Sequence, residues 1–121
     1  MTEIKNSWGS LTITSEENLF IVKPKGVITP ELIKKDLVEA RKFADRAGPW
    51  FYVVDISDVL VAHPMNLFQL KKIKSLPNLH GYYVISRYSI QRLLANCGKL
   101  LVGIDRIFAD LDQIRSYLAR Q

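Results

Sequence analysis

The chain has 121 residues, of which 48% are hydrophobic and 24% are charged. These are ordinary globular values, so they argue against a disordered chain or a fibrous repeat. The length suits one domain that buries an independent core. Seventeen Lys and Arg against twelve Asp and Glu give a net charge of +5, which favours acidic partners. The basic residues are spread along the chain without a basic, aromatic-rich segment, so nucleic acid is not an expected partner.

Two further features indicate the compartment. No apolar run approaches the ~20 residues that cross a bilayer, and the polar first six residues lack the apolar core of a secretion signal. The single cysteine, Cys97, cannot form an internal disulfide and fits a reducing compartment. We therefore expect a cytoplasmic protein without a transmembrane segment.

The amino-terminal part predicts a hairpin. We expect residues 1–9 to be a flexible N-terminus. Apolar and polar residues alternate over Leu11–Thr14, and Leu19–Lys23 continues as a second strand after turn residues 15–18. Pro24 cannot donate a hydrogen bond to a neighbouring strand, so the second strand is expected to break there or to lie partly at an edge.

A helix is predicted next. Thr29-Pro30-Glu31 carries a capping side chain, a first-turn proline and an acidic residue, and Gly48-Pro49 ends the segment. The helix carries one apolar stripe at three- and four-residue spacing, formed by Ile33, Leu37, Ala40, Ala44 and Ala47. Charged residues, including Lys34, Lys35 and Asp36, are expected to face elsewhere.

The rest of the chain alternates strands with helices. The apolar runs Trp50–Ile56 and Gly81–Ser86 predict interior strands, which helices cover on both faces. A second helix is expected between His63-Pro64 and Leu76-Pro77. Later elements are a third helix capped by Ser89, a short strand over 104–108 and a last helix capped by Asp110. The order ββαβαβαβα over residues 10–121 predicts a single α/β domain with a mixed, largely parallel sheet.

This order resembles the STAS domain of anti-sigma-factor antagonists, and in particular its SpoIIAA-like branch. Val53–Val59 is similar to the family's third strand, where an Asp, an apolar residue and a Ser precede a loop. Arg92–Gly98 resembles the third helix, and Asp105–Phe108 resembles the short final strand. The resemblance implies SpoIIAA-like topology and a regulatory domain that binds another protein.

The sequence departs from that family at one functional position. Phospho-regulated members carry an Asp-Ser-Ser-Gly type motif in which a hydroxyl accepts phosphate. Here the stretch reads His63-Pro64-Met65-Asn66, and Met65 falls close to the hydroxyl position. Methionine cannot accept phosphate, so we expect no serine phosphorylation switch.

Catalytic, cofactor and metal sites are not expected. A metal site would require His63 and His80 to share a metal with Asp55 or Asp58. The favoured interpretation is that both histidines are ordinary loop residues. Cys97 lies at an apolar helix position, where a small core residue is more common than a nucleophile. The sequence contains no GxSxG, P-loop or GxGxxG motif. An enzyme is therefore only the third hypothesis.

Asp55 and Ser57 are expected to order the loop that follows a buried strand. Carboxylates there sometimes act in catalysis, but Asp side chains organise turns more often.

Six residues are candidate contacts for a partner or ligand: His63, Met65, Asn66, Phe68, Lys71 and Lys72. They surround the carboxyl end of a central strand, where open α/β sheets bind ligands. The alternatives remain open: Met65 is equally compatible with burial, Phe68 is expected to be core, and the lysines are expected to be a solvated helix face.

Two functions from different classes follow. The leading hypothesis is a non-catalytic regulatory module that binds another protein, or a second copy of itself. The alternative is a carrier or sensor of a small apolar molecule or lipid with a Sec14-like pocket, supported by the large apolar residues Met65, Phe68, Leu70 and Ile73.

Overall fold

The computed structural model describes residues 2–62, 66–88 and 103–120. Within these ranges the strands are β1 (Thr2–Lys5), β2 (Gly9–Glu16), β3 (Leu19–Ile28), β4 (Trp50–Asp55), β5 (Asp58–Ala62), β6 (Leu79–Ile85) and β7 (Arg106–Phe108). The helices are α1 (Pro30–Arg46), α2 (Asn66–Lys71), the 3-10 helix η1 (Lys72–Ser75) and α4 (Leu111–Ala119). The expected third helix, which starts at Ser89, lies outside the described residues.

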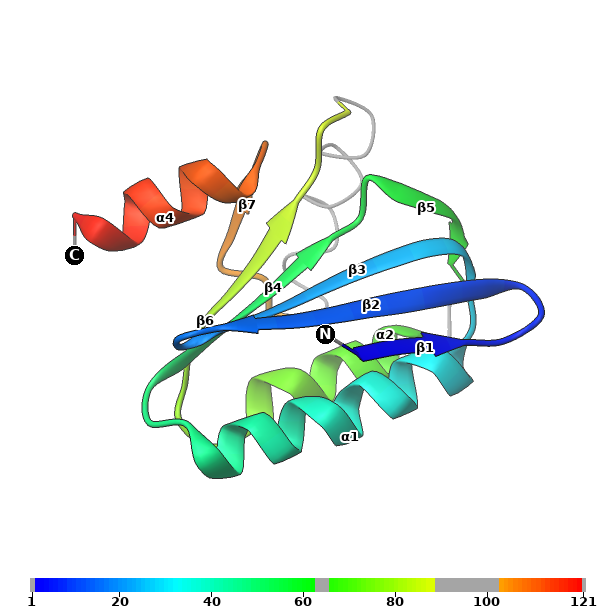
Figure 1. Ribbon diagram of the computed structural model, residues 1–121, viewed down its shortest axis with the longest axis horizontal. Helices are drawn as coiled ribbons and strands as arrows, with labels where there is room; N and C mark the ends of the chain where they lie inside the picture. Colours follow the sequence, from blue (N-terminus) through cyan, green and yellow to red (C-terminus); the bar gives the residue numbers. More distant parts are fainter. Residues whose placement is uncertain (1, 63–65, 89–102, 121) are drawn as a thin grey trace.

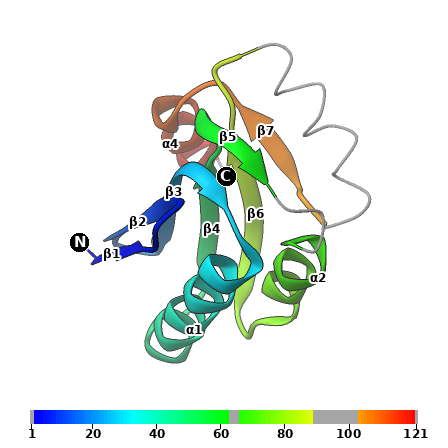
Figure 2. The same ribbon diagram turned by 90° about the vertical axis from the view of Figure 1, so that its right-hand side faces the viewer.

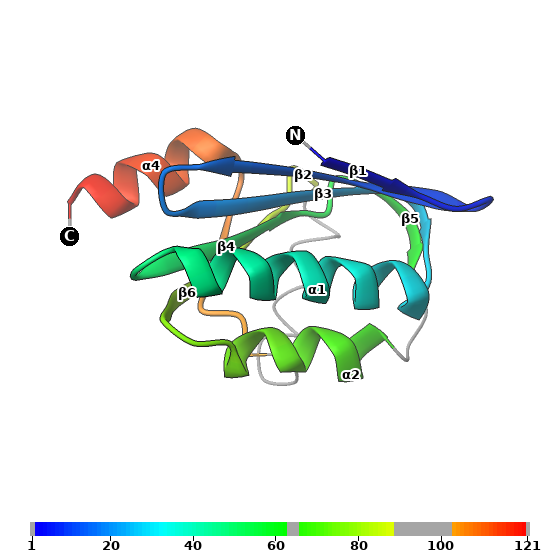
Figure 3. The ribbon, with the colours of Figure 1, turned by 60° about the horizontal axis from the view of Figure 1, so that its bottom comes forward.

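All seven strands belong to one mixed sheet. Its order is β1-β2-β3-β4-β6-β7, and β5 pairs with β3. The pairs β1–β2 and β2–β3 are antiparallel, and every later pair is parallel. Helices α1 and α2 cover one face of this sheet, and α4 lies against the other (Figures 1 and 3). The predicted mixed, largely parallel α/β architecture is confirmed.

The amino-terminal segment is a strand rather than a flexible end, so that expectation is wrong. Thr2–Lys5 pairs with β2, and Ile4 lies opposite the fully buried Leu11. The side chain of Asn6 fixes the following turn, because its Oδ1 accepts hydrogen bonds from the backbone N–H groups of Trp8 and Gly9 at 2.8 and 2.9 Å. One half-buried Ile among polar residues is too weak a pattern to predict a strand.

Pro24 does not break β3. Instead, the parallel partner of β3 changes around this residue. Val22 pairs with Val54 of β4, whereas Lys25 pairs with Asp58 of β5. Pro24 therefore occupies the interval between two parallel ladders, where its missing N–H removes no strand–strand hydrogen bond.

Helix α1 begins and ends where the sequence predicts. Thr29 Oγ1 accepts a hydrogen bond from Leu32 N at 3.5 Å, and Pro30 is the first helical residue. The last helical residue is Arg46, just before Gly48-Pro49.

The face under α1 is packed with aromatic rings. Phe20 contacts Phe43 and Trp50, and Tyr52 contacts both Phe20 and Tyr82, with ring centroids 5.1–6.1 Å apart. These side chains are at most 7% exposed. On the opposite face a second apolar cluster is formed by Leu19, Val53, Tyr83, Ile85 and Ile114. Strand alternation thus sends neighbouring residues of β4 into two different cores.

The second helix lies in the predicted interval. It consists of α2 and then the tighter η1, which ends at Ser75, just before Leu76-Pro77. Figure 2 shows α1 and α2 side by side beneath β4 and β6. At the end of the chain, Asp110 caps α4 as expected, because its Oδ1 accepts a hydrogen bond from Gln113 N at 2.9 Å.

The turn that joins β1 and β2 requires glycine in β3. Gly26 has a φ of +85°, and a Cβ there would lie 3.0 Å from the carbonyl oxygen of Trp8. We expect Gly26→Ala to lower the free energy of unfolding by roughly 1–2 kcal/mol, because a left-handed backbone is costly for a side chain. Urea denaturation measures the change. Gly48→Ala is the matched control, since a Cβ at Gly48 meets no atom within 4 Å. An equal loss in both variants would contradict this explanation.

Candidate functional site

The carboxyl end of β4 leads into a tight turn. Asp55 ends β4, and β5 begins at Asp58. Between them, Ile56 N donates a hydrogen bond to Ile85 O at 3.0 Å, and Val59 N donates to Ile56 O at 3.2 Å. The chain therefore remains attached to β6 until it turns toward β5.

The Asp55 carboxylate is used inside this turn. Its side chain is 8% exposed, and Oδ1 accepts a hydrogen bond from Ser57 N at 3.0 Å. This is the local geometry by which an Asp side chain stabilises a turn. Ser57 is also buried, and among the described residues its Oγ has no hydrogen-bond partner.

A surface hollow of about 360 Å³ lies beside the turn. It is lined by Lys25, Gly26, Ser57, Asp58, Val59 and Leu60. The side chain of Leu60 is 80% exposed. Asp58 forms an ion pair of 3.4 Å with Lys23, but both side chains are solvated, so the pair adds little stability. The hollow thus has apolar and charged side chains at its edge, whereas the Ser57 hydroxyl is buried.

Asn66 is an anchor rather than an exposed contact, so its prediction as a contact needs correction. It is 3% exposed, and its Nδ2 donates a hydrogen bond to Ile28 O at 3.0 Å. This bond attaches the start of α2 to the end of β3. Among the described residues its Oδ1 has no partner. Asn66 is buried because a carbonyl at the end of β3 needs a donor.

Of the other predicted contacts, the structure describes the side chains of Lys71 and Lys72. Lys71 and Lys72 are exposed, but they lie about 7–9 Å from Asn66 along the helix axis. Lys74 is committed to Asp105, with Nζ 2.9 Å from its carboxylate. His63 and Met65 lie outside the described residues, and so does the side chain of Phe68.

His80 cannot share a site with Asp55. The strands β4 and β6 are parallel, and Asp55 pairs with Ile85. His80 lies five residues earlier on β6, so about 16 Å of strand separates the two levels. In residues 2–62, 66–88 and 103–120, no three His, Cys, Asp or Glu side chains group as metal ligands.

The sequence prediction missed a buried carboxyl group. Asp36 was expected on the polar face of α1, but it is fully buried and accepts a hydrogen bond from the Tyr52 hydroxyl through Oδ2. Its Oδ1 has no partner among the described residues. Asp36 lies four residues from both Leu32 and Ala40, so its position on the buried stripe was readable in the spacing.

Burial dominates the ionisation of this group. Loss of solvent raises the pKa of Asp36 to about 7, although the Tyr52 hydrogen bond acts to lower it and the Glu39 charge raises it further. Burial likewise raises the pKa values of Tyr52 and Tyr82, and the nearby Asp36 charge adds to both shifts.

The raised pKa makes stability depend on pH. Between pH 4 and pH 7 the unfolded chain ionises Asp36 while the folded protein keeps it protonated, so stability falls as the pH rises through this window. When the pH rises from 5 to 8, we expect the wild type to lose roughly 2–3 kcal/mol more free energy of unfolding than the Asp36→Asn variant does. Urea denaturation at both values measures this. Asp45→Asn, exposed on the same helix, should keep the wild-type dependence. Parallel pH profiles for all three proteins would refute a raised pKa at Asp36.

The Asp55 turn gives a second prediction. Asp55→Ala leaves the buried Ser57 N–H without its acceptor, so we expect a loss of about 1–3 kcal/mol in the free energy of unfolding. Asp55→Asn keeps an acceptor oxygen and should stay within about 0.5 kcal/mol of the wild type. Thermal and urea unfolding distinguish the two variants. A large loss in Asp55→Asn would show that the negative charge, rather than the hydrogen bond, stabilises the turn.

Comparisons with known proteins give a structural likeness only. No protein-family model matches the chain, and no curated protein sequence matches it significantly. An anti-sigma factor antagonist from Mycobacterium paratuberculosis superposes with a TM-score of 0.67 at 16% identity, covering 90% of this chain and 92% of the other. An uncharacterised protein of the DUF3478 family from Shewanella loihica, described as having a SpoIIAA-like fold, gives a TM-score of 0.66 at 14% identity over 95% and 98%. At these identities the likeness establishes the fold, which is SpoIIAA-like.

One negative finding concerns membranes. None of the helices in the described residues combines the length and the apolar character that crossing a bilayer requires.

Proposed function

We propose that this SpoIIAA-like domain is a non-catalytic regulatory module that binds another protein. One protein with the same fold is an anti-sigma factor antagonist, and the superposition includes 90% of this chain. The net charge of +5 favours a partner with an acidic surface.

The observation that carries the proposal is the exposed side chain of Leu60 on β5. At 80% exposure it contributes little to the core, yet it borders the hollow beside Ser57. Among the described residues, β3 is the only strand that pairs with β5. An edge strand with an exposed aliphatic side chain offers a partner both backbone hydrogen bonds and apolar area.

Two features support a mode of action without serine phosphorylation. Met65 has no hydroxyl at the position where the resemblance places the phosphate acceptor. The nearby Ser57 has a hydroxyl, but its side chain is buried in the turn, so a kinase would have to unfold this turn to reach it. We infer that binding is governed by the concentration of the partner.

The positions of Asp55 and His80 support the proposal that the domain is non-catalytic. Asp55 is committed to a backbone N–H, and His80 lies at the opposite end of the sheet. A general acid–base pair requires two groups that reach the same substrate atom.

The test begins with purification of the chain from its own host at low salt, followed by identification of any stoichiometric partner. The purified pair is then measured by titration calorimetry. We expect Leu60→Asp to weaken binding at least tenfold, because a charge replaces apolar contact area. Val38→Asp is the matched control: Val38 is 55% exposed, but it lies on α1.

Each outcome of this experiment has a defined meaning. Equal weakening by both variants, with folding verified by circular dichroism, would move the contact surface away from β5. Native mass spectrometry of the same preparation reports a second copy of the chain as a doubled mass. A bound small mass without any protein partner would overturn the proposal in favour of an apolar-ligand carrier.

A further inference from the structure

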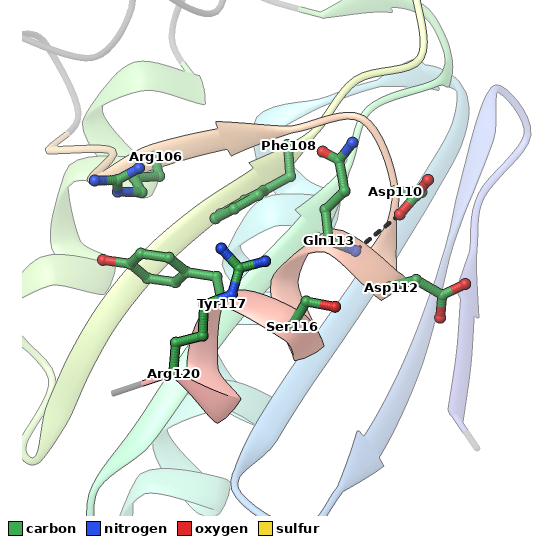
Figure 4. Close-up of a pocket in the computed structure, with 8 residues that line it drawn as sticks. All are labelled: Arg106, Phe108, Asp110, Asp112, Gln113, Ser116, Tyr117 and Arg120. Carbon is green, nitrogen blue, oxygen red and sulfur yellow. Dashed lines mark hydrogen bonds between the residues drawn. The ribbon is translucent and has the colours of Figure 1, made fainter.

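A second hollow, of about 540 Å³, lies between β7 and α4. It is on the sheet face opposite α1 and α2 (Figures 1 and 4). Its lining residues are Arg106, Phe108, Asp110, Asp112, Gln113, Ser116, Tyr117 and Arg120. This volume is within the range of small-molecule sites.

Aromatic rings in mutual contact form one side of the hollow. The ring of Tyr83 contacts Phe108 and Tyr117 edge-on, with centroids 5.6 and 6.0 Å away, and Phe108 lies 5.6 Å from Tyr117. Tyr83 is buried, whereas Phe108 and Tyr117 are half-buried. Part of each of these two rings therefore remains available to a ligand, while the buried Tyr83 ring packs against both and holds them in place.

Two guanidinium groups border these rings. The Arg106 guanidinium lies over the Tyr117 ring, 4.7 Å from its centroid, and Arg120 extends from the end of α4 toward the same ring (Figure 4). Among the described residues, neither Arg106 nor Arg120 forms an ion pair with a carboxylate. Contact with a ring occupies a face of the guanidinium and leaves its N–H edges free for an anion.

The acidic residues of the hollow are already used elsewhere. Asp110 caps α4, and Asp112 lies 3.4 Å from Arg115, whose guanidinium also binds Glu16 at 2.7 Å. In Figure 4 the Asp112 side chain points away from the two arginines.

The polar groups still free in the hollow are therefore mainly hydrogen-bond donors. Gln113 Oε1 accepts a hydrogen bond from Ala109 N at 2.9 Å, so its amide N–H groups remain as donors. The C-terminal end of α4 carries only about half an elementary negative charge, which two full guanidinium charges outweigh.

We propose that this hollow binds a small molecule in which a carboxylate or phosphate group lies beside a flat ring. The anionic group takes the N–H edges of Arg106 and Arg120, since guanidinium groups match both anions in geometry. The ring packs on the exposed parts of Phe108 and Tyr117. The site is independent of the protein-binding function proposed for β5, which lies at another part of the sheet.

The test is a two-dimensional NMR titration of the full chain with four probes at constant ionic strength. Benzoate and phenyl phosphate carry both features of the ligand, whereas acetate and inorganic phosphate lack the ring. We expect saturable shifts of the Arg106 and Arg120 Nε–H signals with both aromatic probes. The matching probes without a ring should bind at least about threefold more weakly. Comparison of benzoate with phenyl phosphate identifies which anion is preferred.

Variants connect binding to the two arginines. We expect Arg106→Gln and Arg120→Gln each to weaken the better aromatic probe about tenfold, because each removes a charge-assisted hydrogen bond. Arg106→Lys keeps the charge without the planar guanidinium fork, so its affinity for the probe should lie between those of Arg106→Gln and the wild type. Arg41→Gln, exposed on α1, removes the same charge from the opposite face and should leave binding unchanged.

Three results would overturn the proposal. The first is the absence of saturable shifts at either arginine. The second is an equal loss of binding in Arg41→Gln, which would indicate attraction by net charge alone. The third is binding that survives Arg106→Gln combined with Arg120→Gln in a protein whose spectrum shows it to be folded.

Discussion

The change of partner along one edge of β3 is the constraint on which the rest of the structure depends. The antiparallel pairing of β2 with β3 is continuous, but the parallel edge pairs first with β4 and then with β5. Pro24 lies where these two ladders are separated. Because β4 must leave β3 there, the chain turns at Ile56 and Ser57, and Asp55 becomes the acceptor within that turn. The hollow beside Leu60 is a direct result of this displacement.

The two faces of the sheet are stabilised in different ways. Under α1, rings and aliphatic side chains fill the space, and one carboxyl group is buried among them with a tyrosine hydroxyl as its donor. Under α4, a smaller apolar cluster supports rings that remain partly exposed, and a guanidinium group lies over one of them. A completely packed face suits a structural role, whereas a half-packed face with unpaired charges retains the capacity to bind. The proposed ligand hollow is on the second face for this reason.

The fold was more predictable than the surface. Thr29 with Pro30 predicted the start of α1, and the apolar run from Trp50 predicted an interior strand, because both depend on local chemistry. The resemblance to SpoIIAA-like domains agreed with the fold that the superpositions establish. The strand β1 was not predictable, since Ile4 gains its burial from distant segments, through pairing with β2 and packing against the core. The arginine hollow was missed because Arg106 and Arg120 are separated in sequence and line one hollow only through the position of α4. Asn66 was misjudged because its partner is a carbonyl 38 residues away.

The two tryptophans occupy contrasting environments, and this gives the protein a built-in optical reporter. Trp50 is fully buried and donates its indole N–H to Pro77 O at 2.8 Å, whereas Trp8 is 70% exposed in the turn beside Gly26. Their emission therefore separates into a blue-shifted component from the core and a red-shifted component that soluble quenchers reach. Gly26 of β3 pairs with Val59 of β5, so the quenchable component originates on the other side of β3 from the strand that carries Leu60. Occupation of that edge and disruption of the core consequently leave different signatures in the intrinsic fluorescence of the unlabelled chain.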